Sequence, residues 1–472
     1  MEPNVEAHIA ALAESKHRPV WFESDDMLEP LPPLNGDATC ELLIIGGGFT
    51  GLWAALQAKE RMPDLNIILV EQTFVGDGAS GRNGGFLSSS LTHGETNGDY
   101  HFPGEAEQLY ELGQQNMKEF IETLERYNID AEYEAVGSTS VATNDAMVAQ
   151  LRKEYEASKA AGDDVVWFDR DDMRRQVNSP TYLAGVWWRD GQDGVVHPAK
   201  LCWGLKKTIL SLGVRIFEGT PVNNIAEDGD GMRSTCDSGN VHSGKILMAT
   251  NAFPGLLPQM RRQVIPVWDY QIATEPLNDE QLASIGWGES RHALSNAANM
   301  FHYYRITKDN RITWGGGGSI CYYYGSRTDQ SVADDPARFK RLAREFLETF
   351  PQLEGVKFTN RWSGIIASST RFCVVPGVTF NGRVSWAIGY TGLGVGATRF
   401  GARMGLELLG YQPSEVLDMV FIKRRAMSWF PEPLRWIGVT LTRHALSKAD
   451  ANGGKRGLWL KILDFFHMGF AC

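Results

Sequence analysis

A glycine-rich turn after the first strongly apolar stretch carries the clearest chemical signal in this 472-residue chain. Apolar residues 42–45 lead into Gly46, Gly48 and Gly51, and a second apolar run ends at Glu71. Gly46 permits a tight turn, Gly48 admits the backbone close to a pyrophosphate, and Gly51 lets the following helix pack on its strand. Glu71 can accept hydrogen bonds from ribose hydroxyls. The spacing predicts a dinucleotide-binding βαβ unit.

The helix after this turn is expected to help hold the phosphates. Phe49 and Thr50 would lie near its amino end, which carries a partial positive charge. Two other glycine-rich segments, 76–85 and 389–396, permit close backbone approach to a planar ligand, and the second leads into a helix over 397–409.

The elements that position these loops follow from apolar spacing and turn residues. After an irregular lead-in over residues 1–40, amphipathic helices are expected over 104–127, 198–212 and 335–349. Strands are expected over 214–218 and 245–250. A hairpin is expected over 300–306 and 311–314, with 307–310 as its turn.

Composition narrows the class of protein. A chain of 472 residues predicts two domains, and its net charge of −11 argues against nucleic acid as a main partner. The six cysteines are scattered without metal-ligand spacing, so we expect reduced thiols, no metal site and a cytoplasmic protein.

The first 19 residues lack a sustained apolar core, so neither a secretory signal nor a transit peptide is expected. No apolar run approaches the roughly 18 residues of a transmembrane helix.

Residues 420–472 differ from the rest in being basic and rich in tryptophan. Short helices of this composition are typical of contact with a membrane surface. The apolar and basic positions are not cleanly separated, which favours a helical appendage that packs Trp429, Trp436 and Trp459 on its own protein or on a second subunit of a homo-oligomer.

Six ordered motifs resemble the D-amino acid oxidase-like flavoprotein superfamily, particularly its glycine oxidase, sarcosine oxidase and γ-glutamylputrescine oxidase branch. The similarity covers most of residues 20–410. The motifs are 46–51 with Glu71, 79–85, 194–198, 249–252, 273–277 and 389–394. The lead-in around Trp21 and the segment 431–436 look most like the γ-glutamylputrescine oxidase type.

The resemblance implies two domains and a C-terminal extension. A discontinuous, Rossmann-like α/β FAD-binding domain (GR2-type) would comprise residues 1–103, 194–262 and 360–410. An α+β substrate domain with an antiparallel sheet would comprise 104–193 and 263–359, and a helical extension would comprise 411–472.

The resemblance also implies FAD as the cofactor. Its contacts would come from the glycine turn, the two glycine-rich loops, and the strand ends near 222 and 250. They are Gly46, Gly48, Phe49, Thr50, Gly51, Glu71, Ser80, Arg82, Asn83, Gly84, Gly85, Val222, Thr250, Asn251, Gly392, Leu393 and Gly394. Related sarcosine oxidases hold the flavin through a cysteine in the segment matching 362–369. This chain has none there, and Cys373 lies too late, so noncovalent FAD is expected.

The reaction implied by the resemblance is hydride transfer from the carbon beside nitrogen of a small amine or amino acid to flavin N5. The resulting imine would hydrolyse, and O2 would accept the electrons to form H2O2. Arg305 is the candidate for binding a substrate carboxylate, although an outward-facing strand residue is the plain alternative. Arg371 and Arg399 are weaker rivals for that role.

Strand alternation puts Tyr303 on the face of Arg305, and His302 with Tyr304 on the other. Tyr303 and His302 are further catalytic candidates. His302 and His93 would either affect flavin reactivity or serve as structural hydrogen-bonding groups. Three aromatic residues would either surround an alkylammonium group or belong to the core, namely Trp268, Tyr270 and Trp362.

Two departures from the family pattern keep other functions open. No lysine occurs between Lys245 and Lys308, where related oxidases place one above the flavin. A dehydrogenase that passes electrons to a quinone or a carrier protein is therefore an alternative. Phe372 replaces a usual aspartate, which leaves a flavin-bearing, non-catalytic subunit as a second alternative.

Overall fold

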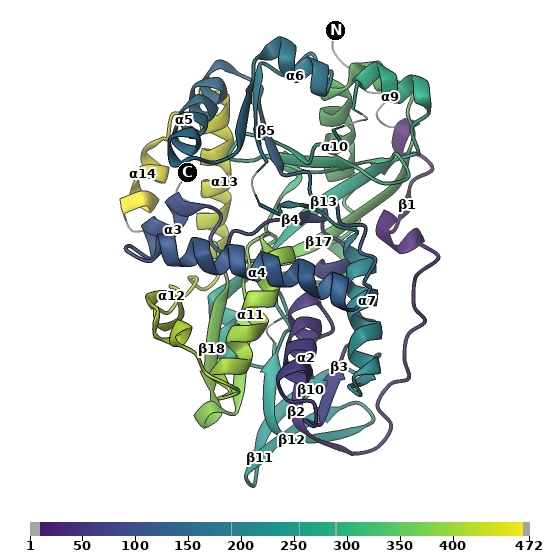
Figure 1. Ribbon diagram of the computed structural model, residues 1–472, viewed down its shortest axis with the longest axis vertical. Coiled ribbons are helices and arrows are strands. Elements are labelled where there is room, and N and C mark those ends of the chain that lie inside the picture. Colours follow the sequence, from purple (N-terminus) through teal and green to yellow (C-terminus); the bar gives the residue numbers. More distant parts are fainter. Residues whose placement is uncertain (1–9, 190, 254, 288–289, 466–472) are drawn as a thin grey trace.

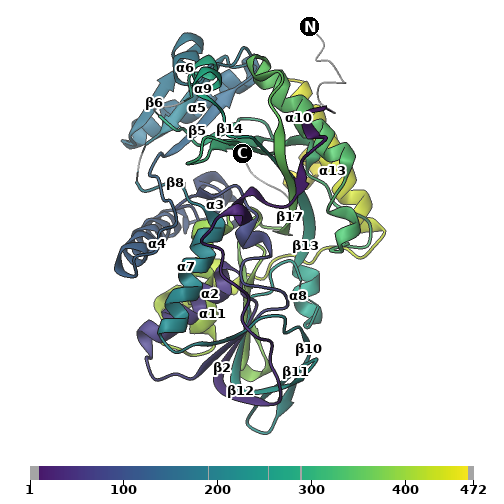
Figure 2. The ribbon, with the colours of Figure 1, turned by 90° about the vertical axis from the view of Figure 1, so that its right-hand side faces the viewer.

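Two β-sheets organise the molecule (Figures 1 and 2). The computed structural model describes residues 10–189, 191–253, 255–287 and 290–465. The ends of the expected lead-in and tail, residues 1–9 and 466–472, lie outside the described residues, as does Cys472.

The sheet in the lower half of Figure 1 contains the dinucleotide-type βαβ unit. Its centre is parallel, in the order β19–β12–β2–β3–β9, and β10, β11 and β18 pair antiparallel at its sides. The bounds are β2 Ala38–Ile45, β3 Ile67–Val70, β9 Arg215–Phe217, β10 Val222–Asp228, β11 Gly231–Cys236, β12 Gly239–Met248, β18 Val375–Thr379 and β19 Val384–Ile388. Helices α2 Phe49–Arg61, α7 Pro198–Ser211 and α11 Gly394–Leu408 cover this sheet.

The second sheet has nine strands and is mainly antiparallel. Its order is β1–β17–β13–β16–β15–β14–β5–β7–β6. The bounds are β1 Lys16–His17, β5 Ser138–Ala142, β6 Val165–Phe168, β7 Ala184–Trp188, β13 Val264–Thr274, β14 Leu294–Asn296, β15 His302–Ile306, β16 Ile312–Gly316 and β17 Phe358–Ser369. Helix α10, Pro336–Thr349, packs on β13 and β16.

The remaining helices surround the two sheets. Helix α4 runs across the front in Figure 1 and contacts α11, and α13 lies on the outer side of the nine-stranded sheet in Figure 2. The bounds are α3 Glu95–His101, α4 Ala106–Arg126, α5 Asp145–Ala161, α6 Arg170–Gln176, α8 Pro258–Gln263, α9 Asp279–Ile285, α12 Val420–Lys423, α13 Leu434–Ala451 and α14 Leu458–Phe465. Two short strands, β4 Phe86–Leu87 and β8 Gly194–Val195, pair with each other.

Apolar packing fixes which side of the nine-stranded sheet is open for a ligand. Phe346 and Phe350 pack against Trp314 of β16, so α10 and its end close one side of the sheet. The other side faces loop 76–85 of the parallel-sheet half, where Gln271 of β13 donates to Arg82 O at 2.9 Å. The site must therefore lie between the two sheets.

The expected fold class is confirmed: an α/β sheet of Rossmann-like order, a second antiparallel-rich sheet and C-terminal helices. The hairpin is confirmed as well, since Thr307 N donates to Arg311 O at 2.8 Å across the expected turn. Strand β17 pairs with β13 along its whole length. The expected boundary at residue 360, between the substrate domain and the last FAD-binding segment, falls near the start of β17. Across the described ranges, no helix combines the length and apolar character of a bilayer-crossing segment.

Candidate functional site

The glycine turn before α2 has no room for side chains. Gly46 has φ 115°, and a Cβ there would lie 2.6 Å from Ala249 O. A Cβ on Gly51 would lie 2.0 Å from Gly46 O. Both distances are shorter than real Cβ contacts, so only glycine permits this strand-to-helix turn.

The amino end of α2 opens toward loop 76–85. Gly48 is the N-cap and makes no side-chain capping bond. Phe49 N donates to Ser80 Oγ at 2.8 Å, and a Cβ on Gly48 would lie 2.9 Å from the same oxygen. A backbone without side chains at a helix amino end provides N–H groups and positive partial charge for an anion such as a pyrophosphate.

Glu71 lies beside this turn at the end of β3. Its Oε2 accepts from Gly47 N at 2.7 Å, and its Oε1 accepts from Thr73 N at 3.0 Å. Burial raises the pKa of this carboxyl, against the effect of these hydrogen bonds. The contacts hold the carboxylate at the position where a dinucleotide ribose is expected.

Loop 76–85 is shaped by the side chain of Asn83. Its Nδ2 donates to Ala79 O and Ser80 O at 3.1 and 2.8 Å, and its Oδ1 accepts from Gly85 N at 2.8 Å. Arg82 forms an ion pair with Asp77 at 2.7 Å. The Arg82 carbonyl accepts from Trp362 Nε1 at 2.8 Å, which joins the loop to β17. Asn83 and Arg82 therefore fix the conformation of the loop.

The third glycine-rich loop contacts both the first glycine turn and segment 249–251. The hydroxyls of Thr50 and Tyr390 lie 2.9 Å apart, and Gly389 N donates to Asn251 Oδ1 at 3.2 Å. Thr250 Oγ1 is buried and has no hydrogen-bond partner in the described part of the chain. These contacts bring segments 46–51, 249–251 and 389–394 together.

The amino end of α11 resembles that of α2 in being uncapped. Leu393 is its N-cap and makes no side-chain capping bond. Gly392 has φ 94° and open space where a Cβ would be.

Val222, which was predicted from the sequence, lies at the start of β10. It follows Thr220 by two residues, and the N–H of Thr220 donates to Glu71 O at 2.8 Å.

Arg305 lies against the glycine loop from the opposite sheet. It is 1% exposed, and its Nη1 donates to Val196 O at 2.8 Å. A Cβ on Gly85 would lie 2.8 Å from this Nη1. Burial lowers the pKa of Arg305 to about 10, and its Nε has no partner among the residues that the structure describes. A buried guanidinium with an unused donor is suited to bind a carboxylate.

Tyr303 shares this face of β15. Its hydroxyl donates to Asp269 Oδ2 at 2.6 Å, and a Cβ on Gly84 would lie 2.7 Å from its ring. Gly315 of the intervening strand β16 makes room for this contact, because a Cβ there would lie 2.8 Å from Tyr303 Oη. Burial raises the pKa of Asp269 to about 6.

Asp269 is the site residue that sequence reasoning missed. An acid within the apolar strand 264–274 is a signal that could have found it, because a buried carboxylate requires hydrogen-bond donors. Its neighbour Gln271 lies on the same face and reaches Arg82 O.

His302 is not brought together with Tyr303 and Arg305. Its Nε2 lies 3.2 Å from Glu345 Oε2 of α10, and its Nδ1 lies 3.1 Å from Gly315 O. The ring stacks on Trp314. His302 therefore lies on the α10 side of the sheet, which agrees with the expected alternation.

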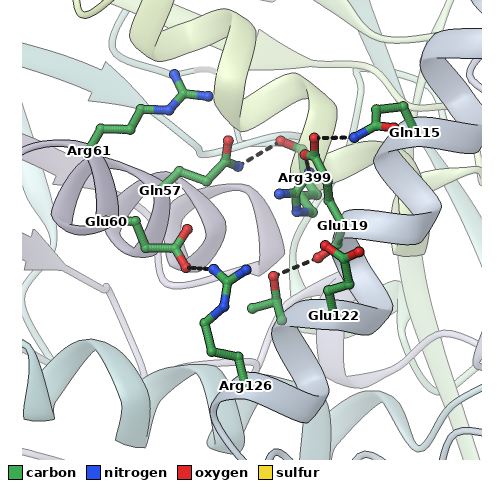
Figure 3. Close-up of a pocket in the computed structure, with 9 residues that line it drawn as sticks. Gln57, Glu60, Arg61, Gln115, Glu119, Glu122, Arg126 and Arg399 are labelled. Atoms are coloured by element: carbon green, nitrogen blue, oxygen red, sulfur yellow. Dashed lines mark hydrogen bonds and ion pairs between the residues drawn. The ribbon is translucent and has the colours of Figure 1, made fainter.

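The two rival arginines bind other parts of the protein. Arg371 Nη1 donates to Phe421 O and Arg424 O at 2.9 and 3.1 Å. Arg399 is paired with Glu119 in a cavity of about 320 Å³ between α2, α4 and α11 (Figure 3). Neither guanidinium lies with Arg305.

The other sequence candidates divide between the two sides. His93 Nε2 lies 3.0 Å from Thr391 O in the third glycine loop, and burial lowers its pKa to about 4. Trp362 contacts Arg82 on the loop side. Trp268 donates to Arg327 O, and Tyr270 packs on Phe339 of α10, so these three aromatic residues do not form one box.

Taken together, the residues fit an extended dinucleotide. The amino ends of α2 and α11, whose N-cap residues make no side-chain capping bond, supply donors, and the carboxylate of Glu71 supplies an acceptor. The tight turn at Gly46 and Gly51 brings the end of α2 close to Glu71. Loop 76–85 contacts the end of α2 through Ser80 and places Gly84 and Gly85 beside Tyr303 and Arg305.

Known proteins share this sequence pattern and fold. Residues 41–408 match the family of FAD dependent oxidoreductases named DAO. The gamma-glutamylputrescine oxidoreductase of Escherichia coli (strain K12) is 30% identical over 82% of this chain and 88% of its own. The probable oxidoreductase OrdL of Haemophilus influenzae is 29% identical over 83% of this chain and 88% of its own.

Among solved structures, glycine oxidase from Geobacillus kaustophilus superposes with a TM-score of 0.66 at 17% identity. The match covers 80% of this chain and 96% of that one, and it shows a shared fold. The family match and the E. coli relative together show that this chain belongs to the DAO family of FAD-dependent oxidoreductases.

Proposed function

We propose that this chain oxidises the C–N bond of a small amine or amino acid to an imine that water hydrolyses, with O2 as the electron acceptor. The observation that carries the proposal is the pair of Arg305 and Tyr303 on the sheet face against Gly84 and Gly85. Bound FAD supplies the two-electron chemistry, by accepting a hydride from the carbon beside nitrogen.

Arg305 binds the substrate carboxylate in this proposal. Its guanidinium is buried, and its Nε has no partner in the described ranges. The low polarity around it strengthens an ion pair with a carboxylate. Trp21, whose ring centroid lies 5.4 Å from the guanidinium carbon, limits where Arg305 can move.

Tyr303 and Asp269 orient the substrate nitrogen in this proposal. The Tyr303 hydroxyl is held by Asp269 at 2.6 Å, so its lone pairs have a fixed direction toward an N–H group. A pKa of about 6 leaves Asp269 able to hold or release a proton near neutral pH. His302 has no role in this scheme, because it contacts Glu345 on the other side of the sheet.

The cofactor contacts proposed for this chain are those assigned from the sequence. The amino end of α2 holds the pyrophosphate, Glu71 holds the adenosine ribose, and residues 392–394 at α11 face the pyrimidine end of the flavin. The proposed attachment is noncovalent. Cys373 supports this, since it is 1% exposed and lies in a separate apolar cluster with Phe400 and Phe421. The domain division given above remains part of the proposal.

A dehydrogenase that uses a quinone or a carrier protein is the second candidate. It is favoured by the sequence between 245 and 308, which supplies no lysine to place beside the flavin. A non-catalytic, flavin-bearing subunit is the third candidate, supported by Phe372 alone.

Stopped-flow mixing of the substrate-reduced protein with air-saturated buffer tests the acceptor. The proposal expects fast return of the oxidised flavin spectrum, with one H2O2 formed for each substrate oxidised. Slow reoxidation in air, with fast reoxidation by a soluble quinone, would overturn the oxidase in favour of the dehydrogenase. A protein whose flavin no amine reduces would favour the non-catalytic subunit.

A further inference from the structure

Helix α13 contacts the protein through several polar side chains and leaves an apolar stripe exposed on its opposite face. Arg435 Nη1 donates to Ser326 Oγ at 2.7 Å, and Arg443 Nη1 donates to Ile320 O at 3.0 Å. Asp450 accepts from Asn299 N at 2.9 Å. Positions 435, 443 and 450 are about two turns apart and share one face of the helix.

The opposite face of α13 is apolar and exposed. Leu434, Ile437 and Leu441 follow one another at spacings of three and four residues, and each is between 43% and 58% exposed. Surface helices normally bury such a stripe. This exposed stripe indicates that something outside the described chain covers the outer face of α13.

Helix α14 lies beside α13 and continues this arrangement. Trp459 Nε1 donates to Thr442 Oγ1 at 3.0 Å, so the tryptophan turns toward α13. Leu458 and Ile462 lie one turn apart and are 77% and 40% exposed. Of the fifteen large apolar side chains exposed in the described ranges, nine fall within residues 427–465. The exposed apolar surface is therefore concentrated on this segment.

The charge of the segment is opposite to that of the whole protein. Residues 420–465 contain nine Lys and Arg against three Asp and Glu, in a chain of net charge −11. Lys448 shares the outer face of α13, and Lys461 shares that of α14 with Leu458. Neither lysine forms an ion pair with a residue that the structure describes, and both are exposed.

We propose that the outer faces of α13 and α14 bind the surface of a membrane that contains anionic lipids. Exposed Leu and Ile side chains enter the boundary between headgroups and acyl chains, while Lys448 and Lys461 contact the lipid phosphates. A second copy of the chain fits less well, because a twofold contact would bring two sets of unpaired lysines together. This proposal does not depend on the substrate or the electron acceptor.

Membrane binding would place the substrate sheet close to the bilayer. Asp450 of α13 accepts from Met300 N at 3.1 Å, two residues before β15, which carries Tyr303 and Arg305. Tyr100 of α3 donates to Asp464 O of α14 at 2.7 Å. Helix α13 thus contacts the segment that leads into β15 of the proposed site, and α14 contacts α3.

Flotation of the full-length, FAD-loaded protein with vesicles tests the proposal. We expect the protein to float with vesicles of phosphatidylcholine mixed with phosphatidylglycerol, to float less with phosphatidylcholine alone, and to be released as the salt concentration rises. The variant Lys448→Glu with Lys461→Glu is expected to bind the mixed vesicles at least about tenfold more weakly. The variant Ile437→Ser with Leu441→Ser is also expected to bind more weakly.

The matched control is Lys118→Glu with Lys207→Glu, which makes the same charge change on α4 and α7 and is expected to float like the wild type. Wild-type protein that stays unbound to the mixed vesicles would overturn the proposal, as would equal loss of binding in the control. Light scattering completes the test. A wild-type dimer that Ile437→Ser with Leu441→Ser converts to a monomer, without vesicle binding, would show that a second copy covers this face.

Discussion

The guanidinium of Arg305 fills the space that a Cβ on Gly85 would need, so strand β15 packs closely on the glycine loop. A Cβ on Gly85 would lie 2.8 Å from Arg305 Nη1, and the same nitrogen donates to Val196 O. The contact joins a strand of the nine-stranded sheet to the loop that approaches the amino end of α2. It therefore positions a cationic side chain at one end of the proposed flavin site.

The absence of a side chain at Gly51 is expected to be required for FAD binding. Gly51→Ala would put a Cβ 2.0 Å from Gly46 O, so the turn must open and the amino end of α2 must move. We expect the purified variant to lose most of its flavin, as measured by the ratio of absorbance at 450 nm to that at 280 nm. Gly438→Ala in α13 is the matched control, because open space surrounds a Cβ there and α13 lies outside the proposed flavin site. Full flavin content in Gly51→Ala would contradict the assignment of this turn.

Arg305→Lys is expected to weaken the binding of substrates that carry a carboxylate. A lysine keeps the charge but loses the forked donor geometry, which corresponds to a rise in KM of about 10- to 100-fold. Steady-state kinetics with an amino acid and with its decarboxylated amine separate the effects, since only the amino acid should be affected. Arg311→Lys on the same hairpin is the control, because Arg311 binds Asp309 and Thr359 instead. Equal losses for both substrates would argue against carboxylate binding.

The contribution of Asp269 to the stability of the protein is expected to fall as the pH rises through the range in which this carboxyl loses its proton. Burial raises the pKa of Asp269 from its usual 3.8 to about 6, so the folded state binds this proton more tightly than the unfolded state. The contribution of this group to the free energy of unfolding therefore decreases between about pH 4 and 6, by about 3 kcal/mol, and this cost remains above pH 6.

Asp269→Asn removes this effect and keeps an oxygen for the Tyr303 hydroxyl. We expect its free energy of unfolding to rise relative to the wild type as the pH is taken from 4 to 7, as measured by urea denaturation of the FAD-loaded proteins. Asp230→Asn at the exposed turn between β10 and β11 is the control. A constant difference between Asp269→Asn and the wild type across this range would disprove the raised pKa.

Acid denaturation is expected to release the flavin. Residues 362–369 contain no cysteine, and Cys373 is 1% exposed within the apolar cluster of Phe400 and Phe421, so neither the segment nor this residue is expected to bond to FAD. After precipitation with trichloroacetic acid, the yellow colour should remain in the supernatant. Flavin that stays with the precipitated protein would show a covalent bond.

The fold and the cofactor half of the site follow from local sequence patterns. The GxGxxG turn, the acid at Glu71 and the turn over 307–310 depend on residues close together in the chain. Strand alternation likewise placed Tyr303 with Arg305 and His302 with Tyr304, because it requires only the period of a strand.

The contacts made across the sheets could not be predicted in this way. Tyr303 reaches Asp269 over β16 because Gly315 lies between them, and this depends on the register of three strands. Two of the carbonyl partners of Arg371, Phe421 O and Arg424 O, come from a segment 50 to 53 residues later in the chain. Both sides of α13 contain apolar residues, so the sequence does not indicate which side packs on the protein and which side stays exposed.

The most direct test of the proposed amine oxidation is anaerobic reduction of the bound flavin by matched substrate pairs. Each pair would consist of an amine or amino acid and the hydroxy compound with the same carbon skeleton, mixed in a stopped-flow instrument with loss of absorbance at 450 nm as the readout. The proposed function predicts that one or more amines bleach the flavin within the time of turnover, while their hydroxy counterparts do not. Bleaching by a hydroxy acid, with none by its amine, would contradict it.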